Sequence, residues 1–328
     1  MIIDRYISYV KNIKRYSPRT VLIYEEVIRK YAKVVFGTDD VSDVQLVECL
    51  NPSELRSYEV ALIDIEKLTP KTVRLHMSAL SGFCRFLVKD GLLQSNPVRL
   101  IPKPKVEKRL PHFYRMDAMT DYFKNTEVNA SQEYLDGFLQ SPHSELGKKL
   151  YEDRLGRLII SMLFSTGLRR SELIALDVQD IDFGRKVAKV RGKGNKMREI
   201  PLIVSLCEEI LLYLKAVETL TGEERSLKSP LLVTYAGNRL YPGYVDRTVK
   251  RELGDVKGIT GRKSPHVLRH SLATELMNED ADLNSIKEML GHSSLATTQV
   301  YTHSSFARLK NIYQTAHPRA KNGGKNGD

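Results

Sequence analysis

The stretch Ser264-Pro265-His266-Val267-Leu268-Arg269-His270 combines a predicted helix start with two side chains that can bind an anion. Serine followed by proline is typical of an N-cap and the first residue of a helix. His266 and Arg269 are three residues apart, so they share one face of the first turn. Two donors at a helix N-terminus form a better phosphate site than either alone. His270 is out of phase, and the pattern leaves open whether its role is structural.

Two further basic residues precede this stretch. In Thr166-Gly167-Leu168-Arg169 a glycine ends one predicted helix and Arg169 begins the next, where free backbone N–H groups favour an anion. Lys193 lies at the tip of a predicted hairpin between strands at 186–191 and 197–202. A surface arginine and a solvated turn lysine are the alternative interpretations. The glycine-rich turn lacks the Gly-Lys-Ser/Thr ending of a phosphate-binding loop, which argues against ATP binding.

Two more residues stand out near the C-terminus, in Leu290-Gly291-His292 and at Tyr301. Taken separately, each is as consistent with a structural role as with a chemical one. His292 and His303 could begin a zinc site, but no third ligand follows at a usual spacing. We therefore expect neither a metal nor a cofactor.

The composition favours a polyanionic partner. The chain has 328 residues, a formal net charge of +11 and a sequence pI near 9.4, and such a basic balance fits nucleic acid without requiring it. Three widely spaced cysteines form neither a disulfide framework nor a zinc pattern. Charges at Asp4 and Arg5 exclude an apolar signal-peptide core, and the longest apolar stretch, near 158–164, is too short for a membrane span. We expect a cytoplasmic protein with no membrane partner.

The predicted organisation is a mainly α-helical chain. Helices begin at Ser17-Pro18, Asn51-Pro52 and Thr69-Pro70, each with a cap and an early proline. A helix is expected near 116–124, followed by a polar stretch at 125–149 without strong periodicity, and no internal repeat is visible. The expected parts are an N-terminal helical bundle (1–96), a basic, proline-rich linker (97–111), a mixed α+β domain with a small antiparallel sheet (112–318) and a disordered tail (319–328).

Taken together, these residues resemble the active site of the tyrosine recombinase (phage integrase) family. The likeness rests on an ordered set: Arg169, Lys193, His266, Arg269, His292 and Tyr301. The words Thr-Gly-Leu-Arg, Gly-Lys-Gly-Asn-Lys and Leu-Gly-His-Ser-Ser are especially similar to those of bacterial Xer recombinases, and the resemblance spans about Ser17 to Tyr313. The helical N-terminal part (1–96) is similar to the core-binding domain of that family, so the resemblance implies that it binds DNA. It implies likewise that 112–318 is the catalytic domain. The segment 125–149 departs from the family, because it is longer than the compact pattern needs.

The resemblance implies strand cleavage by Tyr301, which would give a 3′-phosphotyrosyl intermediate. It implies that Arg169, Arg269 and His292 stabilise the negative charge of the transition state. His266 would accept the proton of the tyrosine, and Lys193 would protonate the leaving 5′-oxygen.

The same resemblance implies double-stranded DNA with paired inverted half-sites and a homo- or hetero-tetramer on two DNA sites, with a DNA translocase as a further candidate partner. Xer-like resolution of chromosome dimers, linked to chromosome partition and cell division, is the role that it favours. A mobile-element integrase is the first alternative. A type IB topoisomerase and a non-catalytic DNA-binding protein are more distant ones.

Overall fold

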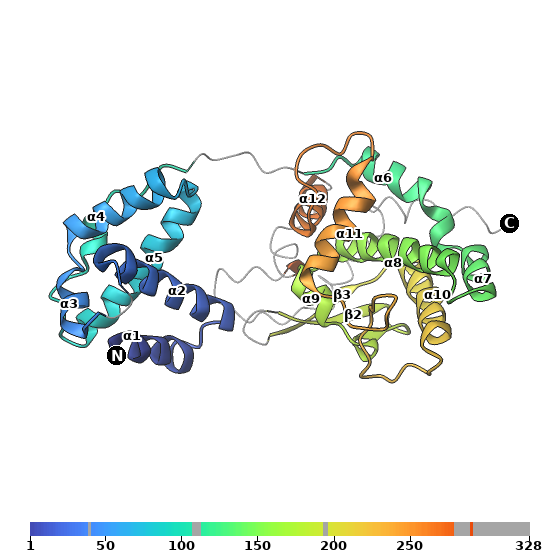
Figure 1. Ribbon diagram of the computed structural model, residues 1–328. Helices are drawn as coiled ribbons and strands as arrows, with labels where there is room; N and C mark the ends of the chain where they lie inside the picture. The colour runs from blue at the N-terminus through green and yellow to red at the C-terminus, as the bar shows by residue number, and fades with distance from the viewer. Residues whose placement is uncertain (39–40, 107–112, 193–195, 279–288, 291–328) are drawn as a thin grey trace. The chain divides into compact units, whose positions relative to one another are not determined.

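The computed structural model describes residues 1–38, 41–106, 113–192, 196–278 and 289–290. The chain divides into two compact units, Met1–Arg109 and Leu110–Asp328 (Figure 1). Both are dominated by helices, and the second also contains a small antiparallel sheet. The predicted fold class is therefore confirmed. Among the described residues, no helix combines the length and the apolar composition that crossing a membrane requires.

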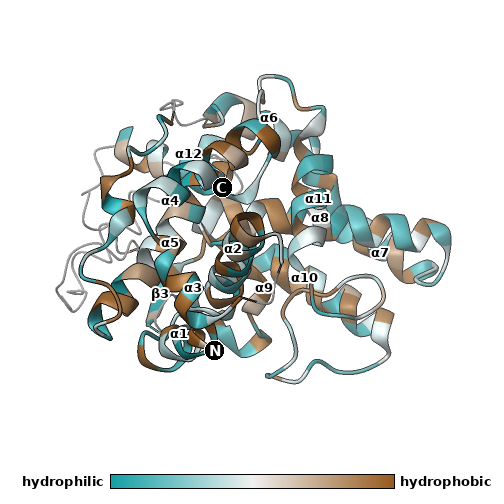
Figure 2. Cartoon of the chain, turned by 60° about the vertical axis from the view of Figure 1, so that its left-hand side comes forward, coloured by the Kyte–Doolittle hydropathy of each residue, from teal (hydrophilic) through white to brown (hydrophobic). Residues whose placement is uncertain are grey.

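The described part of the first unit is helical throughout. Its elements are α1 (Ile2–Ser8), η1 (Tyr9–Ile13), α2 (Pro18–Phe36), α3 (Asp43–Glu48), α4 (Pro52–Val60), η2 (Ala61–Ile65), α5 (Pro70–Lys89) and η3 (Pro97–Leu100). Helix α5 buries an apolar stripe that includes Val73, Leu80 and Leu87. Figure 2 shows how hydrophobic and hydrophilic residues alternate along α2 in the same unit. These stripes meet in one core.

The two long helices of the first unit begin alike, although no internal repeat is visible in the sequence. Ser17 caps α2 and Thr69 caps α5, each accepting a hydrogen bond from the backbone N–H three residues later, at 3.2 and 3.3 Å. Both caps follow a π-helical turn and a residue with positive φ, namely Arg15 at 51° and Lys67 at 53°. The same helix-to-helix turn is therefore built twice.

The end of the first unit differs from the expected start of the linker. Val98 and Ile101 are buried in the core of this unit. The short helix η3 therefore belongs to the first unit, and the residues that follow it, 101–106, form neither helix nor strand. Burial of these two side chains holds the segment against the first unit, although the neighbouring prolines cannot continue a helix.

The second unit is built around a helix that is buried on nearly all sides. Its elements are α6 (Met116–Asn125), η4 (Glu127–Ala130), α7 (Gln132–Gln140), α8 (Glu145–Thr166), α9 (Arg170–Ala175), η5 (Val178–Asp180), β1 (Ile181–Asp182), β2 (Val187–Arg191), β3 (Met197–Pro201), α10 (Val204–Thr221), α11 (Pro242–Gly254) and α12 (Pro265–Asn278). Helix α8 packs against α7, α10, α11 and α12 (Figure 1). It therefore provides a fixed axis for the residues at its end.

The segment 125–149 is more regular than expected. It contains α7 and the start of α8, and Leu135 and Phe138 of α7 are buried. The sequence of this segment has no strong periodicity because two buried side chains in a polar helix give only a weak pattern. Packing of α7 against α8 and α10 stabilises the helix instead.

The sheet confirms the predicted hairpin and adds a strand. Its order is β1-β2-β3, and all pairs are antiparallel. In the hairpin, Arg191 pairs with Met197 and Val190 with Arg198. The two-residue strand β1 was too short to leave a pattern in the sequence. The tip of the hairpin, at 193–195, lies outside the described residues.

Candidate active site

Arg169 is positioned by the sharp end of α8. Gly167 ends this helix with φ of 62°, a conformation that favours glycine. A side chain there would also collide with its surroundings, because an added Cβ would come within 2.4 Å of Leu290. Helix α9 begins directly afterwards, and Arg169 is its N-cap residue, as predicted. Its side chain remains 31% exposed.

Arg269 lies on α12 and reaches the same turn from the other side. Its guanidinium donates to the carbonyl oxygens of Gly167 and Leu290, and only 7% of the residue is exposed. Burial, followed by the charge of Arg169, lowers the pKa of Arg269 to about 10. The side chain is therefore still a cation at neutral pH. The structure thus brings together two predicted residues that are 100 positions apart in the sequence.

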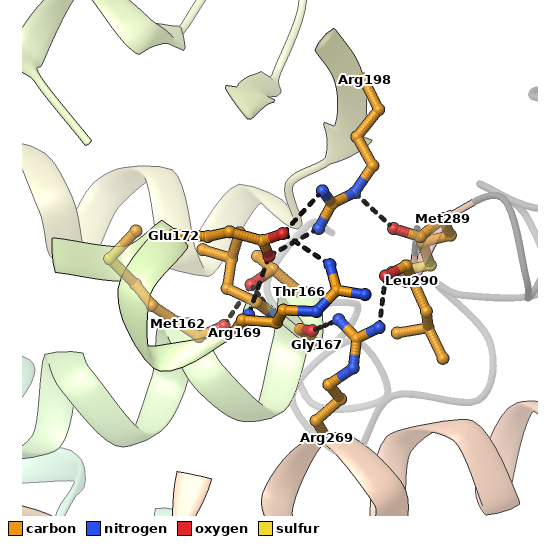
Figure 3. A network of polar contacts seen from close by, with 10 residues as sticks. Met162, Thr166, Gly167, Arg169, Glu172, Arg198, Arg269, Met289 and Leu290 are labelled. Carbon is orange, nitrogen blue, oxygen red and sulfur yellow. Dashed lines mark hydrogen bonds and ion pairs between the residues drawn. The ribbon is translucent and has the colours of Figure 1, made fainter. Parts of the chain in front are cut away.

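A carboxylate lies between these arginines and a third one (Figure 3). Glu172 Oε1 accepts from Arg169 Nη1 at 2.7 Å, and Oε2 accepts from the backbone N–H of Arg169 at 2.9 Å. Arg198 of β3 donates from Nη1 to Oε1 at 3.0 Å and from Nη2 to Oε2 at 2.8 Å. Burial by itself would raise the pKa of Glu172, but hydrogen bonds from Arg198 and Arg169 outweigh it and lower the pKa below its ordinary range.

We call these four side chains, Arg169, Glu172, Arg198 and Arg269, the arginine cluster. Arg169 and Arg198 bind the Glu172 carboxylate, and Arg269 binds two carbonyl oxygens, so the four side chains together carry a formal excess of two positive charges. Because Arg169 is partly exposed, this excess can act on an anion that approaches from solvent. Phosphate oxygens are an anion of the right kind for several guanidinium donors.

The hairpin that carries Lys193 has its base against the arginine cluster. Gly192 is the last described residue before the tip, and its N–H donates to the carbonyl oxygen of Lys196 at 2.8 Å. A Cβ added at Gly192 would lie 3.2 Å from Arg198 Nη1 and 3.8 Å from Glu172 Oε1. Lys193 itself lies outside the described residues, but its neighbour Gly192 lies beside the cluster.

The other predicted site residues are placed only in part. His266 is exposed on the first turn of α12, three residues before the buried Arg269. His292 and Tyr301 lie outside the described residues, as does His303. In the described part of the chain, no three His, Cys, Asp or Glu side chains are grouped as metal ligands would be.

Sequence reasoning missed Glu172 and Arg198. Glu172 was detectable, because an acidic residue three positions after an N-cap returns to it. Arg198 was detectable from the strand period, since Ile200 and Leu202 are buried in the same alternation. An arginine on the inward face of a strand requires a buried partner, and Glu172 is that partner.

Comparison with known proteins gives two family matches and close relatives. Residues 147–308 match the phage integrase family, and residues 3–91 match the phage integrase N-terminal SAM-like domain. The tyrosine recombinase XerC of Chlorobaculum parvum is 34% identical over 97% of this chain and 94% of its own. The tyrosine recombinase XerC of Haemophilus influenzae is 32% identical over 97% of this chain and 98% of its own.

Among solved structures, a lambda integrase tetramer bound to a Holliday junction shares the fold. It aligns with a TM-score of 0.58 and 19% identity, over 91% of this chain and 79% of that chain. The match extends the family relationship from sequence to three-dimensional architecture.

Proposed function

Because the chain belongs to the phage integrase family of tyrosine recombinases, we propose that its Tyr301 hydroxyl attacks the scissile phosphate of a DNA strand. As a member of that family, the chain is a site-specific DNA recombinase of the Xer-like type. The attack forms a 3′-phosphotyrosyl bond and releases a 5′-hydroxyl. The 5′-hydroxyl of a partner strand then attacks the phosphotyrosyl bond, which exchanges strands without an energy cofactor.

The arginine cluster is the observation that supports this proposal. As the tyrosine attacks, negative charge gathers on the non-bridging oxygens of the phosphate, and preorganised donors stabilise it. Arg169 and Arg269 are held by Glu172 and by the carbonyl oxygens of Gly167 and Leu290, so they need little rearrangement when the phosphate binds. We assign them to the non-bridging oxygens, together with His292.

Two proton transfers complete the proposal. A free tyrosine has a pKa of about 10, so at neutral pH it needs a proton acceptor, and we assign this role to His266. The leaving 5′-oxygen needs a proton, and we assign this role to Lys193. The exposure of His266 on α12 and the contact of Gly192 with the cluster support both assignments.

The nucleophile is tested with a nicked suicide DNA that traps the covalent intermediate. Wild-type protein is expected to form a complex that resists denaturation, whereas Tyr301→Phe binds DNA with similar affinity and forms none. Tyr313→Phe is the matched control, because it removes a nearby phenol in the sequence and should trap DNA normally. Covalent trapping by the Tyr301→Phe protein would contradict the proposal.

The general acid is tested by changing the leaving group. Lys193→Ala should cleave ordinary DNA poorly but cleave DNA with sulfur at the 5′-bridging position nearly as wild type does, because a thiolate leaves without a proton. Lys196→Ala, at the other side of the hairpin tip, should cleave both substrates normally. An equal loss by Lys193→Ala on both substrates would remove it from this role.

For the biological role, we propose Xer-like resolution of chromosome dimers by a tetramer on two sites made of inverted half-sites. The names of the relatives support this choice over a mobile-element integrase. The lambda integrase tetramer on a Holliday junction supports the tetrameric assembly. A paralogous recombinase and a DNA translocase are the partners to seek, and a DNA substrate favours the expected cytoplasmic location. Mapping covalently trapped DNA in the native genome should give one chromosomal site. Trapping at the ends of an integrated element would favour the alternative.

A further inference from the structure

Each of the three guanidinium nitrogens of Arg198 donates a hydrogen bond within the protein. Its two Nη atoms bind the two oxygens of Glu172, and its Nε donates to the carbonyl oxygen of Met289 at 2.9 Å (Figure 3). Only 10% of the side chain is exposed. Arg198 is therefore itself fully engaged with the protein.

The acceptors of Arg198 are the supports of the two arginines assigned to the phosphate. Glu172 binds Arg169 through its side chain and its backbone N–H. Met289 precedes Leu290, whose carbonyl oxygen accepts from Arg269. One side chain of β3 thus fixes both the carboxylate behind Arg169 and the backbone behind Arg269.

We propose that Arg198 is a positioning residue for strand cleavage: it holds Glu172 and the Met289–Leu290 backbone so that Arg169 and Arg269 face one phosphate. The inference rests on the proposed function and adds a residue to it. Without Arg198, the Glu172 carboxylate has both oxygens available to Arg169 and draws that guanidinium away from the phosphate. A lysine cannot replace Arg198. Its single ammonium lacks the planar array of donors that binds both oxygens of Glu172 and the carbonyl oxygen of Met289 at once.

The same sheet provides a matched control. Arg185 donates from its two Nη atoms to the two oxygens of Glu199, both at 2.8 Å. This pair has the same geometry as Arg198 with Glu172, but its side chains are 58% and 36% exposed. Glu199 neighbours Arg198 in β3, and strand alternation places it on the other face. Arg185→Met therefore removes a two-bond ion pair from the sheet without touching the cluster.

The first experiment compares Arg198→Met, Arg198→Lys and Arg185→Met in single-turnover cleavage of saturating suicide DNA. Misplacement of a catalytic group by about 1 Å can slow a reaction about 10²-fold, so both Arg198 variants should cleave about 30- to 100-fold more slowly. Their half-site affinity should stay within about 3-fold of wild type, because only 10% of the Arg198 side chain is exposed and Glu172 neutralises its charge. Arg185→Met should match wild type in both measurements. Wild-type cleavage by Arg198→Met would overturn the inference.

A double-mutant cycle separates positioning from a general loss of stability. Because Arg198 acts in part through Glu172, the double variant Arg198→Met/Glu172→Gln should cleave faster than the product of the two single losses predicts, although the contact with Met289 is still lost. Independent, multiplying losses would overturn the inference. Should Arg198→Met not fold, Arg198→Lys is measured in the same cycle.

DNA with a changed leaving group shows whether Arg198 positions Arg169 and Arg269 or instead positions Lys193. The loss in Arg198→Met should persist on DNA with a 5′-bridging sulfur, and its recovery on that DNA would show that Arg198 serves the hairpin instead. Failure of wild-type protein to trap DNA through Tyr301 would refute the proposed function. Normal trapping by wild type, together with wild-type cleavage by Arg198→Met, would refute only this inference.

Discussion

Two groups of charged side chains lie at helix α8, one within the helix and one just beyond its end. They differ in how many cations accompany one carboxylate. Within the helix, Arg157 contacts Glu209 of α10, with 3.4 Å between Nε and Oε1, and the two side chains are only 3% and 1% exposed. Ser161 also donates to Glu209, and Arg157 donates to the carbonyl oxygen of Phe123. Beyond the end of the helix, the arginine cluster carries excess positive charge and leaves Arg169 31% exposed. Arg157 and Glu209 pair one cation with one carboxylate, whereas the described members of the arginine cluster are three cations and one carboxylate.

The difference separates a structural ion pair from a site for an anion. A buried pair of opposite charges needs no further ligand, and breaking it leaves one uncompensated charge. Several cations around one carboxylate, with one reaching the surface, are costly unless an anion joins them. The comparison therefore predicts that substitutions at Arg157 change stability, whereas substitutions at Arg169 change the reaction.

The largest effect is expected for Arg157→Met. Removing this guanidinium leaves Glu209 buried, and breaking a buried pair costs about 3–5 kcal/mol of the free energy of unfolding. Denaturant unfolding measures the loss, and single-turnover cleavage at low temperature measures the reaction of the folded protein. Cleavage per folded molecule should match wild type. A folded Arg157→Met protein with slow cleavage would break the distinction.

Arg169→Ala should have the opposite profile. Loss of one preorganised donor slows cleavage by about 10²- to 10³-fold, while the midpoint of thermal unfolding changes little because the side chain is partly exposed. Arg170→Ala is the control, since it removes the next arginine in the sequence, whose partner is Asp246 on α11. Equal cleavage by the two variants would contradict the assignment of Arg169.

The double variant Arg157→Met/Glu209→Leu should be far more stable than Arg157→Met alone. Replacing both members of a buried ion pair by apolar residues is often neutral or stabilising, so we expect unfolding free energy within about 1–2 kcal/mol of wild type. A double-mutant cycle by denaturant unfolding gives this coupling. Additive losses would show that the two charges do not depend on each other.

The smallest effect is a pH dependence at Glu172. Its pKa is lower in the folded protein than its ordinary value, because the hydrogen bonds from Arg198 and Arg169 outweigh the effect of burial. The ionised carboxylate therefore contributes stability that is fully present above the ordinary glutamate pKa of about 4.3. This contribution is lost as pH falls through the lowered pKa. The stability gap between wild type and Glu172→Gln should shrink on acidification below that range, and a gap independent of pH would contradict the shift.

Local signals in the sequence predicted much of the fold. The Ser-Pro and Thr-Pro starts of α2 and α5, the glycine end of α8 and the β2–β3 hairpin all depend on neighbouring residues. Helix α7 was missed because packing rather than local pattern stabilises it. The repeated helix-to-helix turn was missed because its common feature is a positive φ, at Arg15 and Lys67, and not a shared run of residue types.

The candidate site shows the same limit. Arg169 and Arg269 were predicted from separate motifs, but their convergence on Gly167 depends on the packing of α12 against α8. Glu172 and Arg198 carry no chemistry in the proposed reaction, so a motif built on reacting groups did not include them. Lys193, His266, His292 and Tyr301 stay predictions in their catalytic roles.

A structure of the wild-type protein with cleaved half-site DNA and orthovanadate tests the central claim most directly, because vanadate adopts the geometry of the phosphoryl-transfer transition state. The account predicts vanadium bonded to the Tyr301 oxygen, with its equatorial oxygens accepting hydrogen bonds from Arg169 and Arg269. Vanadium bonded to another residue, or held beyond hydrogen-bond distance of both guanidinium groups, would contradict it.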